Sequence, residues 1–427
     1  MKVVIIGAGL QGVTTAYFLS KAGHDVTVLE RRETSGQETS FANGGILTPS
    51  MSDPWNAPGC WKEMLTTIGQ EDSPLLIRPK ALPGMIGWGM KFLANSNPKT
   101  YLNTTFNNFI LAQYSVQIMH SIRAETGIQY DSSTRGTLKL YSDPELMTRK
   151  SVLLEQVSER GLRFQKLSRE QVISREPALA IGAGRLAGGF FFPDDESGDA
   201  FMFCQALMEE TRRLGVKYIF NCTVNSLVTS NHQLLKVITN KEDHTPDGVI
   251  LATGTFGGQL ARQLGTRLPI QPVKGYSLTL PVEGKNIVPK LPVVDDGLHA
   301  AITPLGDRIR VAGTAEFAGF DQTLSNARIE NLRDILATVY PHLDDRVHRD
   351  KGEAWCGFRP MSADGLPLIG KLGSMENVYI NAGHGPLGWT MAAGSARLLS
   401  DMITGRETEI DLSPYSPDRH KNRRKII

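Results

Sequence analysis

A glycine-rich turn lies between two apolar runs within the first 30 residues of the chain. Residues 3–6 and 26–29 are short, largely β-branched runs, which is typical of parallel strands buried on both faces. The glycines between them, Gly7, Gly9 and Gly12, follow the G-x-G-x-x-G spacing and open a predicted helix. This order of strand, turn, helix and strand predicts a Rossmann-like unit at the start of an α/β fold.

Each glycine of this turn has a physical role in holding a dinucleotide. Gly7 allows the tight turn, Gly9 lets the backbone approach a pyrophosphate, and Gly12 lets the helix pack against the strand. The helix N-terminus offers N–H groups to phosphates, and Glu30 can accept hydrogen bonds from a ribose diol. The contacts predicted for an adenine dinucleotide come from Gly7, Ala8, Gly9, Gly12, Glu30 and Arg31.

Three later segments favour FAD over NAD. Residues 38–50, ETSFANGGILTPS, predict a polar loop, which is either a surface loop or one wall for a large planar cofactor. Residues 249–252 predict a strand that leads to Thr253 and Gly254. Residues 377–397 predict a strand, a glycine loop and a helix from near Trp389, whose dipole suits a flavin that gains negative charge on reduction. The residues expected to contact FAD here are Thr39, Ser40, Asn43, Gly44, Gly45, Thr253, Gly254, Gly383, His384, Gly385, Leu387, Gly388, Trp389 and Thr390.

Length and composition restrict the class of protein. The chain has 427 residues, so two or more domains are expected. A net charge of +2 gives no reason to expect nucleic-acid binding. Four cysteines without a CxxC pair predict no metal site or disulfide scaffold and indicate a reducing compartment. No apolar stretch approaches the about 18 residues of a membrane span, so a cytoplasmic location is predicted.

A single arginine, Arg359, stands in a segment dominated by apolar and small residues, WCGFRPMSADGLPLIG at 355–370. Its guanidinium keeps its charge and is costly to bury alone, so an anionic partner is expected. That partner is either an Asp or Glu of the protein or the carboxylate of a ligand, which a guanidinium can hold through two parallel hydrogen bonds.

Together these segments resemble the FAD-dependent D-amino acid dehydrogenases of the D-amino acid oxidase and glycine oxidase superfamily. The resemblance also includes PVKGYSLTLP at 272–281 and NAGHGPLGWTMAAGS at 381–395. It implies an α/β fold in which a Rossmann-like FAD-binding domain is interleaved with a substrate domain built on a mostly antiparallel mixed sheet. The expected division is 1–85, 190–265 and 350–417 for the FAD-binding domain, 86–189 and 266–349 for the substrate domain, and 418–427 for a basic tail.

The resemblance also implies a reaction and its residues. A D-amino acid would lose a hydride from Cα to flavin N5, water would convert the imino acid to a 2-oxo acid and ammonia, and a membrane quinone would take the electrons. Arg359 would grip the substrate carboxylate. Tyr276 and His299 would line the substrate pocket, although an aromatic residue is the family pattern at position 299. Tyr276 and His384 are further catalytic candidates, and the backbone of Val224 would contact the adenine side.

Several alternatives stay open at this level. Enzymes acting on D-hydroxyproline, secondary amines or opines have similar motifs, and a flavin-binding protein without turnover is a third possibility. His384 is otherwise a loop residue bonded to the backbone, and Tyr276 a core tyrosine. Lys274 either approaches the flavin or is solvated.

Two helices and the tail complete the predictions. Residues 199–222 predict a helix capped by Asp199, a stop at Gly215 and a strand. Residues 96–130 predict a helix in or beside the substrate domain. The Lys- and Arg-rich residues 418–427 are either a solvated tail or a contact to an anionic membrane, which would place the protein peripherally on the cytoplasmic face of the inner membrane.

Overall fold

A six-stranded sheet forms the dinucleotide-binding half of the molecule. The computed structural model describes residues 1–71, 73–282, 287–344 and 352–420. All neighbours in this sheet are parallel except the edge pair β18–β19. The strand order is β18 (Leu368–Lys371), β19 (Val378–Ala382), β12 (Gly248–Leu251), β1 (Lys2–Ile6), β2 (Asp25–Leu29) and β9 (Lys217–Ile219).

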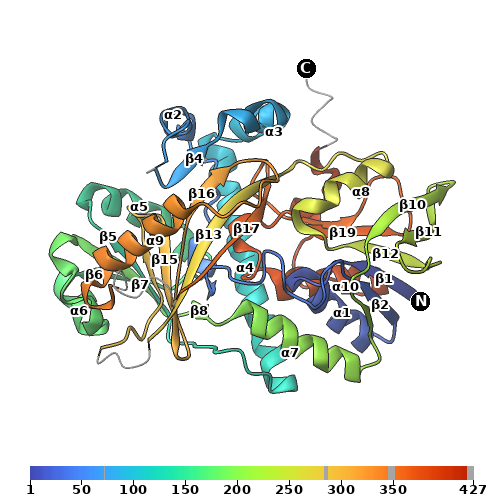
Figure 1. Ribbon diagram of the computed structural model, residues 1–427, viewed down its shortest axis with the longest axis horizontal. Coiled ribbons are helices and arrows are strands. Elements are labelled where there is room, and N and C mark those ends of the chain that lie inside the picture. Colours follow the sequence, from blue (N-terminus) through green and yellow to red (C-terminus); the bar gives the residue numbers. More distant parts are fainter. Residues whose placement is uncertain (72, 283–286, 345–351, 421–427) are drawn as a thin grey trace.

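The central position of β1 explains its apolar sequence. It pairs with β12 on one side and β2 on the other, and its residues from Val3 to Ile6 are buried. Helix α1 (Leu10–Lys21) packs against α10 (Ala392–Thr404) and α7 (Ala200–Arg213), so both ends of the chain share one core with β1. Figure 1 shows the blue N-terminal strands beside the red C-terminal elements of this sheet. The predicted Rossmann-like unit is confirmed.

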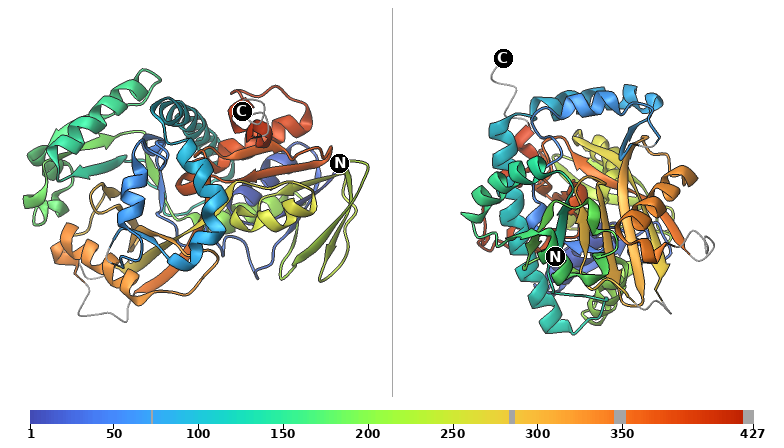
Figure 2. Two further views of the ribbon diagram at one scale, coloured as in Figure 1. Left: turned by 90° about the horizontal axis from the view of Figure 1, so that it is seen from above. Right: turned by 90° about the vertical axis from the view of Figure 1, so that its left-hand side faces the viewer.

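A nine-stranded, mostly antiparallel sheet forms the other half. Only two of its pairs are parallel, β14 with β5 and β4 with β16. The two views of Figure 2 show this sheet beside the first one, with α9 (Asn326–Val339) on its outer face. The strand order is β17 (Glu353–Ser362), β13 (Ile270–Pro281), β16 (Arg308–Phe317), β15 (Ala300–Leu305), β14 (Val293–Asp295), β5 (Thr137–Tyr141), β7 (Gly188–Phe192) and β6 (Gln165–Ser168), with β4 (Leu75–Ile77) beside β16.

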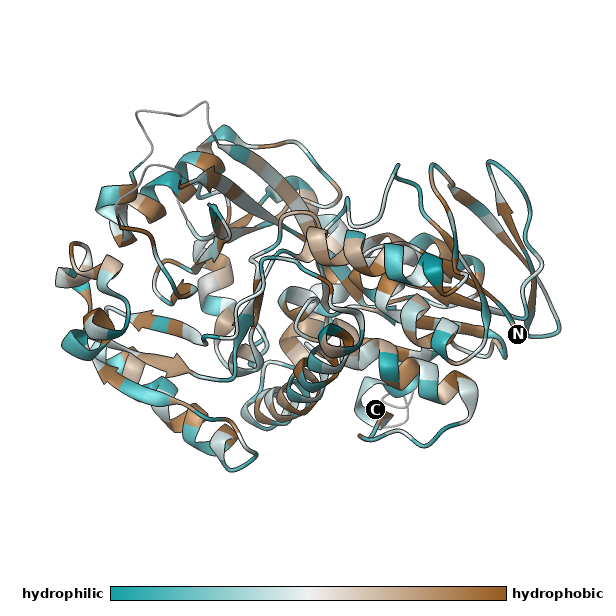
Figure 3. Cartoon of the chain, turned by 90° about the horizontal axis from the view of Figure 1, so that it is seen from below, coloured by the Kyte–Doolittle hydropathy of each residue, from teal (hydrophilic) through white to brown (hydrophobic). Residues whose placement is uncertain are grey.

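The remaining elements are four short strands, the long helix α4 and several shorter helices. In Figure 3 apolar colour follows the strands of both sheets, whereas the outer helices alternate between apolar and polar residues. These elements are β3 (Ile46–Leu47), β8 (Glu196–Ser197), β10 (Val224–Ser230), β11 (Gln233–Thr239), α2 (Cys60–Thr66), α3 (Leu82–Ala94), α4 (Pro98–Thr126), α5 (Pro144–Ser158), α6 (Arg169–Arg175) and α8 (Gly257–Gln263). Among the helices of the described residues, none combines the length and apolar character needed to cross a bilayer.

Three segments differ from the predicted division into domains. Strands β4 and β17 belong to the nine-stranded sheet, although 1–85 and 350–417 were assigned to the FAD-binding domain. Helix α4 shares its Phe109 with the cluster around β5 and β7, while its later residues pack with α1 and α10. It therefore bridges both cores. The exact domain boundaries stay a prediction.

The first part of the predicted basic tail is packed against the fold. The Arg419 guanidinium is held by Asp364 at 2.8 and 2.9 Å, which corrects its place in a free tail. The remaining residues, 421–427, lie outside the described part of the chain, so a contact of the tail with an anionic membrane stays a prediction.

Candidate functional site

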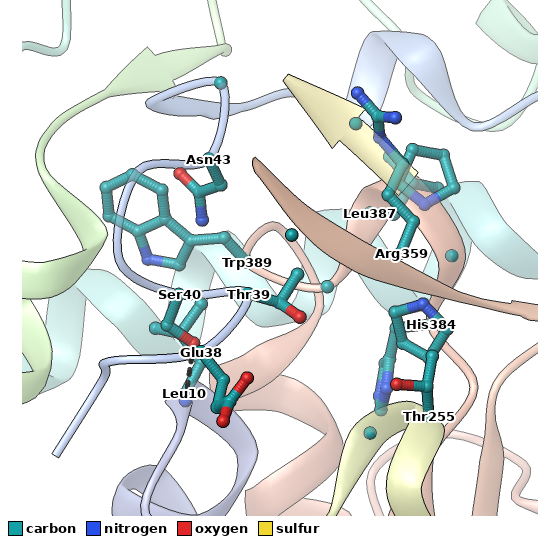
Figure 4. Close-up of a pocket in the computed structure, with 18 of the residues that line it drawn as sticks. Leu10, Glu38, Thr39, Ser40, Asn43, Thr255, Arg359, His384, Leu387 and Trp389 are labelled. Atoms are coloured by element: carbon teal, nitrogen blue, oxygen red, sulfur yellow. Dashed lines mark hydrogen bonds between the residues drawn. The ribbon is translucent and has the colours of Figure 1, made fainter. Parts of the chain in front are cut away.

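One cavity of about 1030 Å³ extends from the first glycine turn to the face of the nine-stranded sheet. Its size is at the upper end of ordinary ligand sites, which suits a large cofactor together with a small substrate. In Figure 4 the 38–43 loop lies on one side, with Arg359 and His384 on the other. Both sheets and both ends of the chain therefore contribute to a single site.

Two glycines at the dinucleotide end cannot carry a side chain. Gly7 has φ +104°, and a Cβ there would lie 2.6 Å from the carbonyl oxygen of Ala252. A Cβ on Gly12 would lie 1.8 Å from the carbonyl oxygen of Gly7. Both obstructions are backbone atoms, so they cannot move aside. The turn therefore holds the N-terminus of α1 against the strand end, as the spacing predicts.

Acidic and basic groups surround this turn. The Glu30 carboxylate is buried and accepts hydrogen bonds from the backbone N–H of Ala8 at 2.7 Å and of Arg32 at 2.9 Å. The Arg31 guanidinium pairs with Glu38 and lies 3.8 Å from the centre of the Phe256 ring. The N-cap, Gly9, has no side chain, and Ser40 Oγ accepts from the Leu10 N–H at 3.2 Å, which leaves the N–H groups of Gln11 and Gly12 at the α1 N-terminus to an anion.

Several polar atoms on the cavity wall have no protein partner among the described residues. They are Thr253 Oγ1, Thr255 Oγ1, Thr314 Oγ1 and Trp389 Nε1. Buried polar groups are normally hydrogen-bonded, so a polar ligand is expected to supply the missing partners. A dinucleotide with a polar ring system fits this wall, and the residues named above would hold it.

Most predicted cofactor residues line this one cavity. Five do not: Ala8 and Gly12 lie behind the turn, Gly45 and Gly383 shape their loops with φ +69° and +81°, and Thr390 accepts from the Thr48 N–H. Direct contact of these five with a cofactor stays a prediction. The predicted cofactor residues that do line the cavity are Gly7, Gly9, Glu30, Arg31, Thr39, Ser40, Asn43, Gly44, Val224, Thr253, Gly254, His384, Gly385, Leu387, Gly388 and Trp389.

The helix after the second glycine loop begins later than predicted. We expected it near Trp389, but a 3₁₀ turn at Gly385–Leu387 comes first and α10 begins at Ala392. The 3₁₀ turn lines the cavity in place of the helix itself. Glycines and a proline in this loop explain the delay, because they favour tight turns over a regular helix start.

Arg359 lines the cavity as a half-buried cation without an acidic partner in the described part of the chain. Its guanidinium donates one protein hydrogen bond, from Nη1 to the Thr314 carbonyl at 3.0 Å, and lies 5.8 Å from the Trp55 ring. Burial lowers the pKa of Arg359 to about 10, so it remains charged at neutral pH. Among the described residues, no structural ion pair holds this arginine.

A β-bulge positions the acceptor of that hydrogen bond. The β13–β16 pairing shifts between Lys274 and Tyr276, so Thr314 and Ala315 face one residue of β13, Gly275. Thr314 has φ +54°, which is unusual for a β-branched residue. The bulge turns its carbonyl toward Arg359 and leaves its hydroxyl on the cavity wall. The sequence offers no signal for this role, because the bulge depends on pairing between distant strands.

Tyr276 and Lys274 are held by the same buried carboxylate. The Tyr276 ring lines the cavity, and its hydroxyl donates to Glu316 at 2.5 Å. Burial opposes the charge of Glu316, but hydrogen bonds from Tyr276 and Arg78 outweigh it and lower the Glu316 pKa. Lys274 is buried, donates to the Thr323 carbonyl and lies 4.0 Å from Glu316. The expectation that it is solvated is wrong, because the side chain is buried; that it approaches the flavin or holds a water stays a prediction.

The two predicted histidines differ in environment. His384 is buried, its Nε2 lies 2.9 Å from Ser395 Oγ, and burial lowers its pKa to about 3, so it is neutral. His299 lines the cavity but is exposed in the turn before β15, with φ +49°. Because His299 lies in a turn, the pairing of strands does not fix the direction of its ring.

A charged set that the sequence did not reveal lines another part of the cavity. Lys150 Nζ lies 2.7 Å from Asp53 Oδ2, and Lys139 Nζ lies 2.6 Å from Asp296 Oδ1. Each cation has its own anion, so these pairs lack the free charge that distinguishes Arg359. They come from β5, α5 and two loops, and only the fold brings them together.

The chain belongs to the family of FAD dependent oxidoreductases, because the family model "DAO: FAD dependent oxidoreductase" matches residues 2–402. It is 40% identical over 423 residues to a D-amino acid dehydrogenase of Bradyrhizobium diazoefficiens, covering 99% of this chain and 100% of that protein. A D-amino acid dehydrogenase of Vibrio vulnificus is 38% identical over 420 residues, covering 97% and 100%. The protein is thus an FAD-dependent oxidoreductase.

Solved structures show the same fold. The L-proline dehydrogenase from P. horikoshii superposes with a TM-score of 0.77 at 20% identity, covering 99% of this chain and 98% of that one. The glycine oxidase from Geobacillus kaustophilus has a TM-score of 0.76 at 22% identity, covering 98% of each chain. At these identities the likeness concerns the architecture alone.

Proposed function

We propose that this protein oxidises D-amino acids to 2-oxo acids and ammonia. The observation that carries the proposal is the half-buried guanidinium of Arg359, which has no acidic partner among the described residues, in the cavity that also contains the dinucleotide turn. A carboxylate is the ligand that such a cation would bind most strongly. Relatives named D-amino acid dehydrogenase, similar over nearly the whole chain, support the choice of substrate.

Arg359 would hold the substrate by its carboxylate. Its guanidinium can donate two parallel hydrogen bonds to the two carboxylate oxygens, which fixes the orientation of Cα as well as its position. The Thr314 carbonyl restrains Nη1 from the other side. Because the arginine is half-buried in the cavity wall, the pair would form with less competing water than at the surface, which strengthens the attraction.

Neither of the two further catalytic candidates, Tyr276 and His384, is placed to act as a strong base. Burial and the hydrogen bond to Glu316 raise the pKa of Tyr276, and burial makes His384 weakly basic. The substrate amine would therefore enter the reaction already deprotonated, with its lone pair assisting the loss of hydride from Cα. Bound FAD would supply the acceptor for that hydride, and water would then convert the imino acid to the 2-oxo acid and ammonia.

We further propose that a quinone removes the electrons. Oxidation of the amine to the imine releases two electrons and two protons, and a quinone that takes up both becomes a quinol. The overall reaction is then amino acid, quinone and water to 2-oxo acid, ammonia and quinol, which balances.

A substrate panel tests the proposed activity. The holoenzyme is assayed with an artificial dye acceptor against D-alanine, L-alanine, D-hydroxyproline and N-methylglycine. We expect turnover with D-alanine and none above background with L-alanine. Faster turnover with D-hydroxyproline or with the secondary amine than with any primary D-amino acid would reassign the substrate class.

A further inference from the structure

Two ion pairs line the cavity apart from the dinucleotide turn and from Arg359. Lys150 of α5 pairs with Asp53, and Lys139 of β5 pairs with Asp296 in the turn between β14 and β15. These four side chains, which we call the charged cluster, are 13–27% exposed. Ions held this far from bulk water are costly unless polar groups satisfy them. Binding of a carboxylate by Arg359 gives no reason for their presence.

The two pairs of the charged cluster interact with each other. Burial raises the pKa of Asp53, but the attraction of Lys150 and Lys139 outweighs burial and lowers this pKa to about 2. Tyr101 of α4 also donates to Asp53, at 3.3 Å. The cluster therefore combines two cations with two anions in one place, and it has no net charge.

The charged cluster has hydrogen-bonding capacity left for a ligand. An ammonium has three N–H groups. Among the described residues, the structure gives Lys150 one acceptor, Asp53 Oδ2 at 2.7 Å. Each carboxylate can likewise accept more hydrogen bonds than one lysine supplies. A ligand group that both accepts and donates would thus find partners of both kinds on this wall.

A floor of short side chains leads from the charged cluster toward the middle of the sheet. Lys139, Val294, Ala301 and Ala312 stand opposite one another in register on β5, β14, β15 and β16, and all four line the cavity. Residues in register point to the same face of a sheet. The small side chains between Lys139 and β16 leave room above them for a ligand.

The distance between Arg359 and the charged cluster suits an amino acid with a side chain of about four atoms. Arg359 Nη1 donates to the carbonyl of Thr314, so its guanidinium reaches β16. Strands β16 and β5 are three spacings apart in the sheet (Figure 1), which is about 14 Å. An extended glutamine with a hydrogen bond at each end covers about 12 Å, and alanine is three atoms shorter. Trp55, 5.8 Å from the guanidinium, shares its loop with Asp53.

We propose that the charged cluster is a side-chain subsite for D-amino acids that end in an uncharged group with both a donor and an acceptor, such as D-glutamine. The amide oxygen would accept from a lysine, and the amide nitrogen would donate to an aspartate. A charged side chain gains less, because each lysine is opposed by an aspartate. An apolar one would displace water without replacing its hydrogen bonds. The subsite rests on the proposed function, because Arg359 must first hold the substrate carboxylate.

An apolar wall of the same cavity is the competing place for the side chain. It is formed by Cys60, Met64, Leu75 and Phe92, which pack in the apolar cluster around α3. These side chains need no polar partner, whereas the ions of the charged cluster do. A substrate side chain placed on this wall would be apolar, so the two walls predict opposite preferences.

D-Amino acids of matched length test the subsite in the holoenzyme. The readout is kcat/KM with a dye acceptor for D-alanine, D-glutamine, D-glutamate and D-norleucine. D-Glutamine and D-norleucine have side chains of equal reach, one polar and one apolar. We expect kcat/KM for D-glutamine to exceed that for D-norleucine at least about tenfold, and to exceed that for D-glutamate as well.

A double variant tests the charged cluster itself. Asp53→Asn with Lys150→Met removes one pair without leaving an unpaired ion, and Tyr101 keeps an acceptor. The ratio of kcat/KM for D-glutamine to that for D-norleucine should fall at least about fivefold. The control, Lys236→Met with Asp243→Asn, removes an exposed pair outside the cavity and should leave the ratio unchanged. A ratio of two substrates in one preparation does not depend on its flavin content or folded fraction.

Three results would overturn the subsite while the proposed function stands. They are D-norleucine that reacts as well as D-glutamine, D-glutamate that reacts better than D-glutamine, and a double variant that keeps the original ratio. In each of these cases D-alanine is still oxidised. If no D-amino acid reacts, D-alanine included, the proposed function fails and the subsite fails with it.

Discussion

Arg359→Ala is expected to lower kcat/KM for D-alanine by roughly 10²–10³-fold, with most of the change in KM. The reason is that the variant removes the cation that would bind the substrate carboxylate in a buried site. D-Alaninamide, which lacks the carboxylate, should be affected far less. The measurement is steady-state kinetics with a dye acceptor on both substrates, after the flavin content of each protein has been matched.

Arg359→Lys is the matched control for charge alone. Lysine keeps a positive charge but cannot make two parallel hydrogen bonds, so an intermediate loss is expected. If Arg359→Ala lowers kcat/KM equally for D-alanine and D-alaninamide, Arg359 does not bind the carboxylate, and its burial has a structural reason instead.

The variant Gly275→Ala is expected to displace the Arg359 guanidinium and so to weaken its binding of the substrate carboxylate. A Cβ at position 275 would lie 2.2 Å from Arg359 Nη1 and 2.5 Å from its Cζ. The guanidinium is the far end of a flexible side chain, so it can move and the strand pairing can stay. Gly275→Ala should therefore lower kcat/KM by about 10²-fold, as misplacement of a binding group by about 1 Å can do, with little change in thermal stability.

Gly258→Ala provides the control for adding a methyl group. A Cβ there meets nothing within 4 Å, so kinetics and melting temperature should both stay close to those of the original protein. If Gly275→Ala retains full activity, the guanidinium position seen here is not required for turnover. If it loses activity only together with a large fall in melting temperature, the loss reflects folding.

Local sequence signals predicted the dinucleotide half well. Gly7 and Gly12 allow backbone contacts that are too close for any side chain. The glycine spacing predicts these contacts, and the structure contains them. Asp199 was predicted as a helix cap, and its carboxylate accepts from the N–H groups of Phe201 and Met202. Such features depend on neighbours within a few residues, which is why they are visible in one sequence.

Features that arise from distant pairings were not predictable. The bulge at Thr314 exists because β16 pairs with β13, and the burial of Lys274 depends on Glu316 and Thr323. The exposed face of α3 shows the same limit. Its sequence is apolar apart from Lys91, and only the fold reveals that Ile86 and Met90 are exposed.

The central claim is that one cavity brings a flavin and a carboxylate-bearing D-amino acid together. Mixing the oxidised holoenzyme with D-alanine without oxygen or any other acceptor tests it most directly, by following the long-wavelength absorbance of the bound flavin. Rapid bleaching with D-alanine, none with L-alanine and a greatly slowed reaction in Arg359→Ala are the predicted results. A flavin that stays oxidised with every D-amino acid tried would contradict the claim.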